Sequence, residues 1–222
     1  MRIYHMAFFM LFSTGIFAKE IELGVTELTL KSHYGKYSKK LLTDVFKELG
    51  HNLKVSVLPH DKLEKNVLEK KLDGELIRMS KYGDDRPYLV KADVPQFFYN
   101  VAVYGKKDEK ISDWSELKGK KIGFRKGLKI IEIELLKHFK KGDIFHLSKF
   151  NQANILIGLG RIDYFVEVEK VFDDYLKFES PINLKNVKKI GILKKDTAHL
   201  YLRKELSHLI PSINKELKKR VK

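Results

Sequence analysis

The chain has 222 residues, no cysteine and a formal net charge of +15 at pH 7. The absence of cysteine excludes a disulfide framework and a thiolate metal site, and we expect no lipid-modified cysteine. The positive charge favours anionic partners, but the lysines are scattered along every segment. No zinc-finger spacing or aromatic RNA-binding motif accompanies them, so they predict a solvated basic surface and no nucleic-acid partner.

Residues 1–18 have the pattern of a cleavable signal peptide. Arg2 supplies a positive start, residues 6–17 are apolar, and Ala18 ends the cleavage pattern. The apolar stretch is shorter than the roughly 20 residues that a membrane-spanning helix needs. We therefore expect export, cleavage after Ala18, and a soluble, strongly basic protein that is free in the periplasm.

The first half of the exported chain alternates between strand and helix patterns. Glycine and proline separate the segments, with Gly50 closing a helix and Pro59 following a strand. The predicted order is a strand at 21–26, an amphipathic helix at 35–50, and a strand, a helix and a strand at 53–57, 62–72 and 74–79. This order indicates a parallel sheet with helices on its faces.

The pattern restarts after a strand at 97–104. We predict strands at 120–124, 146–150, 162–168 and 187–193, and helices at 128–139, 151–160 and 169–178. Asn151 is the predicted N-cap of its helix, and Gly160 the predicted stop. A last helical stretch is expected from about Thr197, broken at Pro211. The chain therefore reads as two α/β lobes, lobe 1 from residues 19–101 and 195–222, and lobe 2 from residues 102–194.

Four stretches resemble one family in its order along the chain. They are "VLEKKLDGELIRMSKYGDDRPYLVKADVP", "YNVAVYGKK", "ISDWSELKGKKIGFRKG" and "ILIGLGRIDYFVEV". The chain is similar to the bacterial extracellular solute-binding proteins of the amino-acid-binding kind, solute-binding protein family 3, which have the periplasmic binding protein type 2 fold. The resemblance implies an α/β fold of two lobes, each a mostly parallel sheet flanked by helices, joined by a hinge of crossing strands. It implies that solute binds between the lobes, at the C-terminal ends of the strands.

On lobe 1 the predicted carboxylate-binding residue is Arg78, at the end of the strand "GELIRM". An arginine at that position can hold a carboxylate through two parallel hydrogen bonds. The resemblance implies an arginine near this strand end, although many relatives place it several residues later, where Arg86 is the match. Ser80 lies in the same turn and can donate a hydrogen bond. Relatives often stack an aromatic ring on the ligand, and Tyr34 is the expected ring here.

On lobe 2 the predicted contacts are Gly127 and Leu128, at the start of the long helix, whose free backbone N–H groups favour an anion. Relatives often have a threonine after this glycine, so Leu128 leaves only backbone donors. Arg125, in the same turn, either adds a positive charge or points to water. Relatives usually end the next strand with an aspartate that holds the ligand's ammonium group. Val168 occupies that place, so either a neighbouring glutamate, Glu167 or Glu169, substitutes or the ligand has an acid but no amine.

Together these features predict a monomeric periplasmic protein, without cofactor or metal, that closes on a small carboxylate-bearing solute. The solute is amino-acid-like or an organic acid, and the implied partner is an inner-membrane transporter or sensor. One alternative is an interaction or sensor module of the same fold that has lost its ligand. The other is a periplasmic lyase or dehydratase, for which Glu167 or His33 would be the acid or base. A nucleotide site is excluded, because Gly123 and Gly127 match neither nucleotide-binding glycine pattern.

Overall fold

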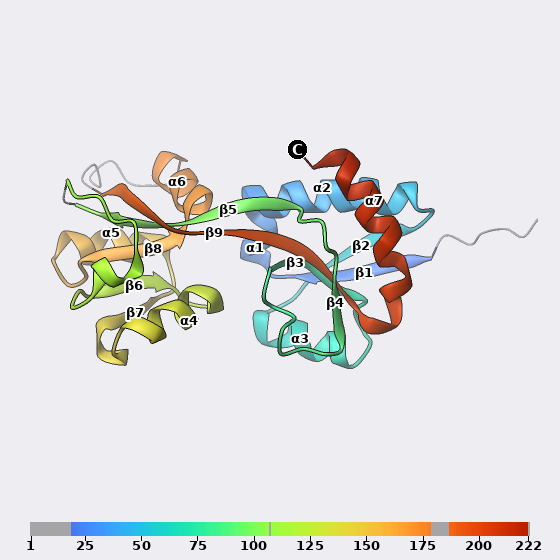
Figure 1. The fold of residues 1–222 in the computed structure, drawn as a ribbon, viewed down its shortest axis with the longest axis horizontal. Coiled ribbons are helices and arrows are strands. Elements are labelled where there is room, and N and C mark those ends of the chain that lie inside the picture. Colours follow the sequence, from blue (N-terminus) through green and yellow to red (C-terminus); the bar gives the residue numbers. More distant parts are fainter. Residues whose placement is uncertain (1–18, 107, 179–186, 222) are drawn as a thin grey trace, which may run out of the picture.

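The computed structural model describes residues 19–106, 108–178 and 187–221, and the predicted signal peptide lies outside them. The described chain forms two lobes of helices and strands joined by two long strands (Figure 1). Both lobes are mixed α/β, as predicted. Within the described ranges, no helix combines the length and apolar character needed to cross a bilayer.

Lobe 1 is built on three parallel strands. The central one lies between its two partners, in the order β2–β1–β3, and the strands are β1 (Glu20–Val25), β2 (Asn52–Val57) and β3 (Gly74–Met79). The long strand β9 (Lys188–Arg203) then pairs antiparallel with β3, and the short strand β4 (Leu89–Lys91) pairs with β9. Four helices pack around this sheet, namely α1 (Glu27–Lys31), α2 (His33–Glu48), α3 (His60–Leu68) and α7 (Ile210–Arg220).

Helix α2 illustrates how the sequence directs this packing. Ser32 caps its N-terminus, because the Ser32 hydroxyl accepts a hydrogen bond from the Gly35 N–H at 3.1 Å. Its buried apolar side chains recur at helical spacing, and they are Leu41, Leu42, Val45 and Phe46. This stripe joins the core of lobe 1, while the lysines of the helix stay exposed.

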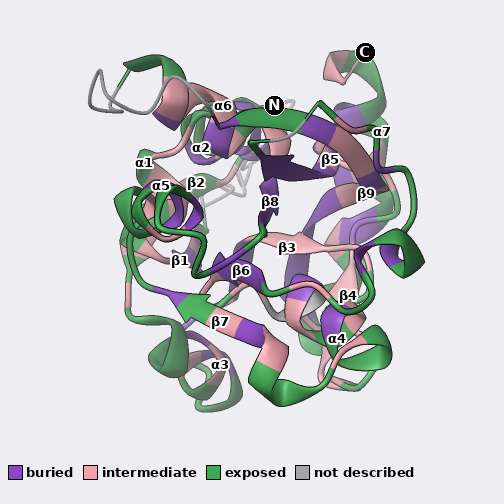
Figure 2. Ribbon diagram, turned by 90° about the vertical axis from the view of Figure 1, so that its left-hand side faces the viewer, coloured by how far each residue is buried: buried purple, intermediate pink, exposed green. Residues whose placement is uncertain are grey.

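Lobe 2 repeats the plan with its own three parallel strands. The order is β8–β6–β7, and the strands are β6 (Ile122–Arg125), β7 (Ile144–Leu147) and β8 (Tyr164–Val168). Strand β8 is buried along its whole length (Figure 2) and pairs antiparallel with β5 (Phe97–Gly105). The helices are α4 (Lys129–His138), α5 (Phe150–Gly158) and α6 (Glu169–Phe178), and 3₁₀ turns lie at Trp114–Leu117 and Lys141–Asp143.

The lobes are joined by β5 and β9, which pair antiparallel from Phe97 opposite Ala198 to Gly105 opposite Lys188. The register shifts between Val101 and Ala102 and again between Val103 and Tyr104. Such irregularities bend a strand locally and increase its twist. The predicted lobe boundaries, at residues 101/102 and 194/195, fall inside these two strands and stay a prediction.

Two expectations at helix ends are wrong. Residues from Thr197 to Arg203 are the last part of β9 and not a helix. This part bonds to β3, β4 and β5 and is buried from Ala198 to Leu202. Its alternation of Ala198, Leu200 and Leu202 with polar or aromatic residues is the pattern of a strand. After a 3₁₀ turn (Lys204–Leu209), Pro211 lies in the first turn of α7, where its missing N–H is tolerated. The N-cap of α5 is Lys149 and not Asn151.

Strand β9 should not accept a side chain at Gly191, near its start. A Cβ there would lie 1.5 Å from the Ile111 carbonyl oxygen, so the backbone of β9 or of its neighbour must move. We expect Gly191→Ala to lower the free energy of unfolding by about 3 kcal/mol. Gly158→Ala is the matched control, because nothing lies within 4 Å of that Cβ and alanine favours a helix. Equal urea midpoints for Gly191→Ala and the native protein would contradict this packing.

Candidate functional site

A hollow of about 400 Å³ lies between the two lobes. Lobe 1 contributes Leu28 of α1, and lobe 2 contributes the rest of the lining, which is Arg125, Ser148, Lys149, Phe150, Asn151 and Tyr175. Arg125 is the last residue of β6, and residues 148–151 connect β7 to the first turn of α5. The hollow therefore sits at the C-terminal ends of parallel strands, where open α/β sheets generally bind ligands.

The charge at the centre of this lining is the guanidinium of Arg125. Its Nε donates to Glu167 Oε2 at 2.7 Å, and its Nη2 donates to Glu167 Oε1 at 3.2 Å. Glu167 has no exposed surface and also accepts the Val168 N–H at 2.8 Å. These bonds orient the Arg125 side chain, which is 15% exposed and whose Nη1 lies outside the pair.

The strand register explains why these two residues meet. Strand β6 pairs with β8 in parallel, with Phe124 opposite Val166, so the next residues, Arg125 and Glu167, come from adjacent strand ends. Glu167, predicted to meet a ligand's ammonium group, lies beneath Arg125 and away from solvent. Its direct contact with a solute stays a prediction from sequence alone.

The rest of the lobe 2 wall combines one exposed cation with aromatic rings. Lys149 is exposed at the N-cap of α5, and the Gln152 side chain holds this turn by accepting the Ser148 and Lys149 N–H groups at 2.8 and 2.9 Å. The rings of Phe150 and Tyr175 lie 5.1 Å apart. The Arg125 guanidinium carbon lies 5.4 Å from the centre of the Phe150 ring, within cation–π range.

Arg78, the residue predicted to hold the solute carboxylate, already holds a carboxylate of its own strand. Its Nε and Nη2 contact Glu75 Oε2, and the Glu75 side chain is 2% exposed. Tyr82 donates its hydroxyl to the other Glu75 oxygen at 2.6 Å. Burial is the largest influence on Tyr82 and raises its pKa above the ordinary value, so the phenol keeps its proton. The role of Arg78 in binding stays a prediction.

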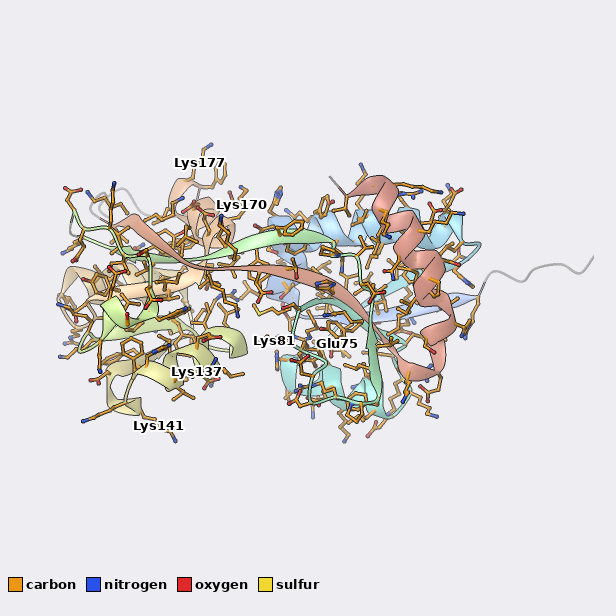
Figure 3. All side chains as sticks on the ribbon, in the orientation of Figure 1. Glu75, Lys81, Lys137, Lys141, Lys170 and Lys177 are labelled. Carbon is orange, nitrogen blue, oxygen red and sulfur yellow. The ribbon has the colours of Figure 1, made fainter. Side chains whose placement is uncertain are left out.

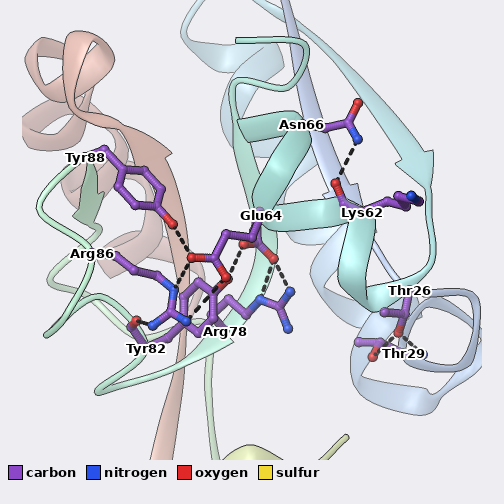
Figure 4. A network of polar contacts seen from close by, with 10 residues as sticks. Thr26, Thr29, Lys62, Glu64, Asn66, Arg78, Tyr82, Arg86 and Tyr88 are labelled. Carbon is purple, nitrogen blue, oxygen red and sulfur yellow. Dashed lines mark hydrogen bonds and ion pairs between the residues drawn. The ribbon is translucent and has the colours of Figure 1, made fainter. Parts of the chain in front are cut away.

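Arg86, the alternative carboxylate-binding residue, belongs to the same network (Figure 4). Its Nε lies 3.2 Å from Glu64 Oε1, its Nη1 donates to the Tyr82 carbonyl at 3.0 Å, and Asp85 also contacts it. The Arg78 and Arg86 guanidinium carbons lie 4.5 and 4.3 Å from the centre of the Tyr82 ring. Both arginines are therefore engaged within lobe 1.

Ser80 takes part in a polar chain that runs along the hinge. Its hydroxyl donates to Asp196 Oδ1 at 2.6 Å. Lys194 then lies 3.4 Å from Asp196 Oδ2 and 3.5 Å from Glu134 Oε1, and Glu134 belongs to α4 of lobe 2. Burial acts to raise the pKa of Asp196, but the bonds from Ser80 and the Thr197 N–H and the charge of Lys194 outweigh it and hold that pKa below its ordinary value.

The remaining predicted residues gather at the apolar side of the hinge. Tyr34 stacks on Phe97, with ring centres 4.2 Å apart. Leu128 is the N-cap of α4 without a side-chain cap bond, and it packs against the same core cluster as Tyr34 and Phe97. Gly127 has φ of +94°, a conformation that favours glycine. None of Tyr34, Gly127 and Leu128 is part of the lining of the hollow.

The sequence alone leaves Arg125 open between a ligand-facing charge and a residue that points to water, and it does not single out Lys149 or Phe150. A usable pattern is present in the sequence, since β6 ends in an arginine and β8 carries a glutamate next to its end. Among the described residues, no group of three or more histidine, aspartate or glutamate side chains is placed to hold a metal ion.

No protein-family model and no curated protein sequence matches the chain. Solved structures do resemble it. The arginine-bound, truncated ArgBP of T. maritima is 18% identical, and the match covers 90% of this chain and 95% of that one with a TM-score of 0.66. A histidine kinase sensor domain with similarity to periplasmic binding proteins is 14% identical over 91% and 90% of the two chains, with a TM-score of 0.71.

A third similar structure is an ABC uptake transporter substrate-binding protein from Streptococcus pneumoniae with bound histidine. It is 18% identical, and the match covers 90% of this chain and 86% of that one with a TM-score of 0.66. At these identities the likeness establishes the fold, so the expected two-lobed, periplasmic-binding-protein-like architecture is confirmed. The three structures are named for binding or for sensing.

The pairing of Arg125 with buried Glu167 predicts an order of stability among variants. Arg125→Met leaves a buried carboxylate without a counter-charge, which should cost about 3 kcal/mol. The double variant Arg125→Met/Glu167→Gln removes both charges, so it should regain a substantial part of that loss. Urea unfolding of the three proteins measures the order. If the single and double variants unfold at the same urea concentration, Glu167 does not depend on Arg125.

The hinge carboxylate predicts a dependence of stability on pH. Because the folded protein holds the pKa of Asp196 below its ordinary value, the ionised group stabilises the fold above the unfolded pKa, near pH 4. That contribution is lost as pH falls through the lower folded pKa. The difference in unfolding free energy between the native protein and Asp196→Asn should therefore shrink from pH 7 to pH 3. A difference that stays constant over this range would contradict the assignment.

Proposed function

We propose that the protein binds a small carboxylate-bearing polar solute between its lobes, in the periplasm and as a monomer, for delivery to an uptake system or a sensor. The observation that carries this proposal is the Arg125 guanidinium, which buried Glu167 orients at a strand end beside the hollow. A charge-assisted hydrogen bond in such a place contributes about 1.5 to 3 kcal/mol. The exposed ammonium group of Lys149 adds a second cation to the same wall.

The fold supplies a way to close on the solute. Leu28 belongs to lobe 1 and the rest of the lining to lobe 2, so a change in the angle between the lobes changes the width of the hollow. Strands β5 and β9 join the lobes, and hinge closure around a ligand is a common use of such a connection. The similarity to structures named for substrate binding supports this proposal.

A second candidate is a sensor or interaction module of the same fold with little ligand affinity. It is favoured by the internal partners that occupy Arg78, Arg86 and Ser80. The similarity to a histidine kinase sensor domain agrees with it. Both candidates use the same fold, and saturable binding of a small solute separates them.

Solute binding should depend on Arg125. A thermal-shift panel of amino acids, monocarboxylates, dicarboxylates and short peptides identifies a ligand, since a ligand at 100 times its Kd adds about 2.7 kcal/mol of stability. By titration calorimetry, Arg125→Met/Glu167→Gln should then bind it at least about 10-fold more weakly, a loss of about 1.4 kcal/mol.

Arg161→Met is the matched control for that experiment, because Arg161 is an exposed arginine of lobe 2 outside the lining of the hollow. It should bind like the native protein. Binding by the double variant at native affinity would show that the site lies elsewhere. If no member of the panel binds saturably to the native protein, the sensor or interaction module becomes the better account.

A further inference from the structure

We propose that the hollow selects a monocarboxylic acid that has an apolar body and lacks an α-ammonium group. This inference rests on the proposed function and names the class of solute that the site accepts. It follows from which charges line the hollow, which charge is withheld from it, and what the remaining walls are made of.

The withheld charge is the carboxylate of Glu167. Both of its oxygens accept hydrogen bonds from Arg125, and Oε1 also accepts the Val168 N–H. The residue has no exposed surface. No acidic side chain is among the described residues that line the hollow, whereas Arg125 and Lys149 both line it. An ammonium group on the solute would therefore meet the uncompensated charge of Lys149 and no accessible carboxylate, and the cost of desolvating it would not be recovered.

The pairing of Arg125 with Glu167 also limits how many solute carboxylates the positive charge of the site can neutralise. Glu167 neutralises the formal charge of Arg125 while leaving its Nη1 outside the pair. The lining therefore carries one uncompensated positive charge, which is that of Lys149. One solute carboxylate matches that charge, and a second carboxylate would enter the hollow without a partner.

The other walls fit an apolar body. Leu28 faces from lobe 1, and the rings of Phe150 and Tyr175 face from lobe 2. A hollow of about 400 Å³ is at the small end of ligand sites, which suits a body such as a phenyl ring or a branched alkyl chain. Ser148 and Asn151 supply polar groups beside Lys149, where a carboxylate would lie.

The test compares acids that differ only in the amine. Titration calorimetry on the full exported chain would measure 3-phenylpropanoate against phenylalanine, 4-methylpentanoate against leucine, and glutarate as the dicarboxylate. We expect at least one of the two monocarboxylates to bind at least about 10-fold more tightly than its amino acid and than glutarate. Lys149→Met should weaken that binding about 10-fold, since it removes the uncompensated charge.

Lys141→Met is the control of equal charge, because Lys141 lies on the outer edge of lobe 2 (Figure 3) and outside the lining. It should leave the affinity unchanged. Tighter binding of phenylalanine, leucine or glutarate would overturn the inference while the proposed function stands. Equal losses in Lys149→Met and Lys141→Met would also overturn it, by showing that only the overall charge matters.

If none of the five compounds binds but another solute of the broader panel does, the inference fails alone. If nothing in either set binds, the proposed function fails with it.

Discussion

The structure depends on the antiparallel pairing of β5 with β9. Each lobe adds its own parallel strands to one side of this pair, with β3 bonded to β9 and β8 bonded to β5. The backbone groups of the connection are thereby hydrogen-bonded, as those of a buried segment must be. The lobes can change their angle by bending the pair at its irregular register near Val101 and Val103. They cannot slide along it without breaking many bonds at once. On the proposed function, motion between the lobes would therefore be confined to bending and twisting, which would change the width of the hollow without dismantling its walls.

Each lobe also buries one glutamate on its sheet, and each glutamate is neutralised by an arginine. In lobe 1 Arg78 and the phenol of Tyr82 both contact the Glu75 carboxylate, so the charges of Glu75 and Arg78 balance each other within the lobe. In lobe 2 the pair of Glu167 and Arg125 stands at the end of a strand and fronts the hollow. A buried pair costs desolvation energy that it only partly recovers. The two arginines are about equally exposed, at 16% and 15%, so what distinguishes the second pair is the place of Arg125 in the lining of the hollow.

The sequence alone predicted the alternation of strands and helices, because glycine and proline punctuate it and α2 carries its apolar stripe at helical spacing. The prediction of a helix from Thr197 was wrong, although Ala198, Leu200 and Leu202 alternate there as in a strand, and the pairing with β3, β4 and β5 is what fixes this part of β9. The short elements α1 and β4 were missed, since five and three residues hold too little periodicity. At the site, Arg125 and Glu167 are 42 residues apart, and only the order β8–β6–β7 makes them neighbours. Arg78 lies near the end of its strand, as predicted, and its partner is the acid three residues earlier in the same strand.

The division of labour between the lobes implies an order of events in binding. Lobe 2 carries the cations of the hollow and most of its apolar wall, whereas lobe 1 contributes Leu28. The many exposed lysines attract anions to the whole molecule, but their fields are screened within about 8 Å at physiological salt and do not discriminate between solutes. Discrimination therefore begins when a solute displaces water beside Arg125, where the local dielectric is lower and each charge counts for more. On the proposed function, closure would follow, because Leu28, half exposed in this structure at 50%, would gain hydrophobic stabilisation on covering an apolar solute body. A solute that binds to the cations and rings of lobe 2 but is polar where it meets Leu28 would bind without closing the lobes. Lobe 2 would therefore select for the charged part of the solute, and Leu28 of lobe 1 for an apolar part.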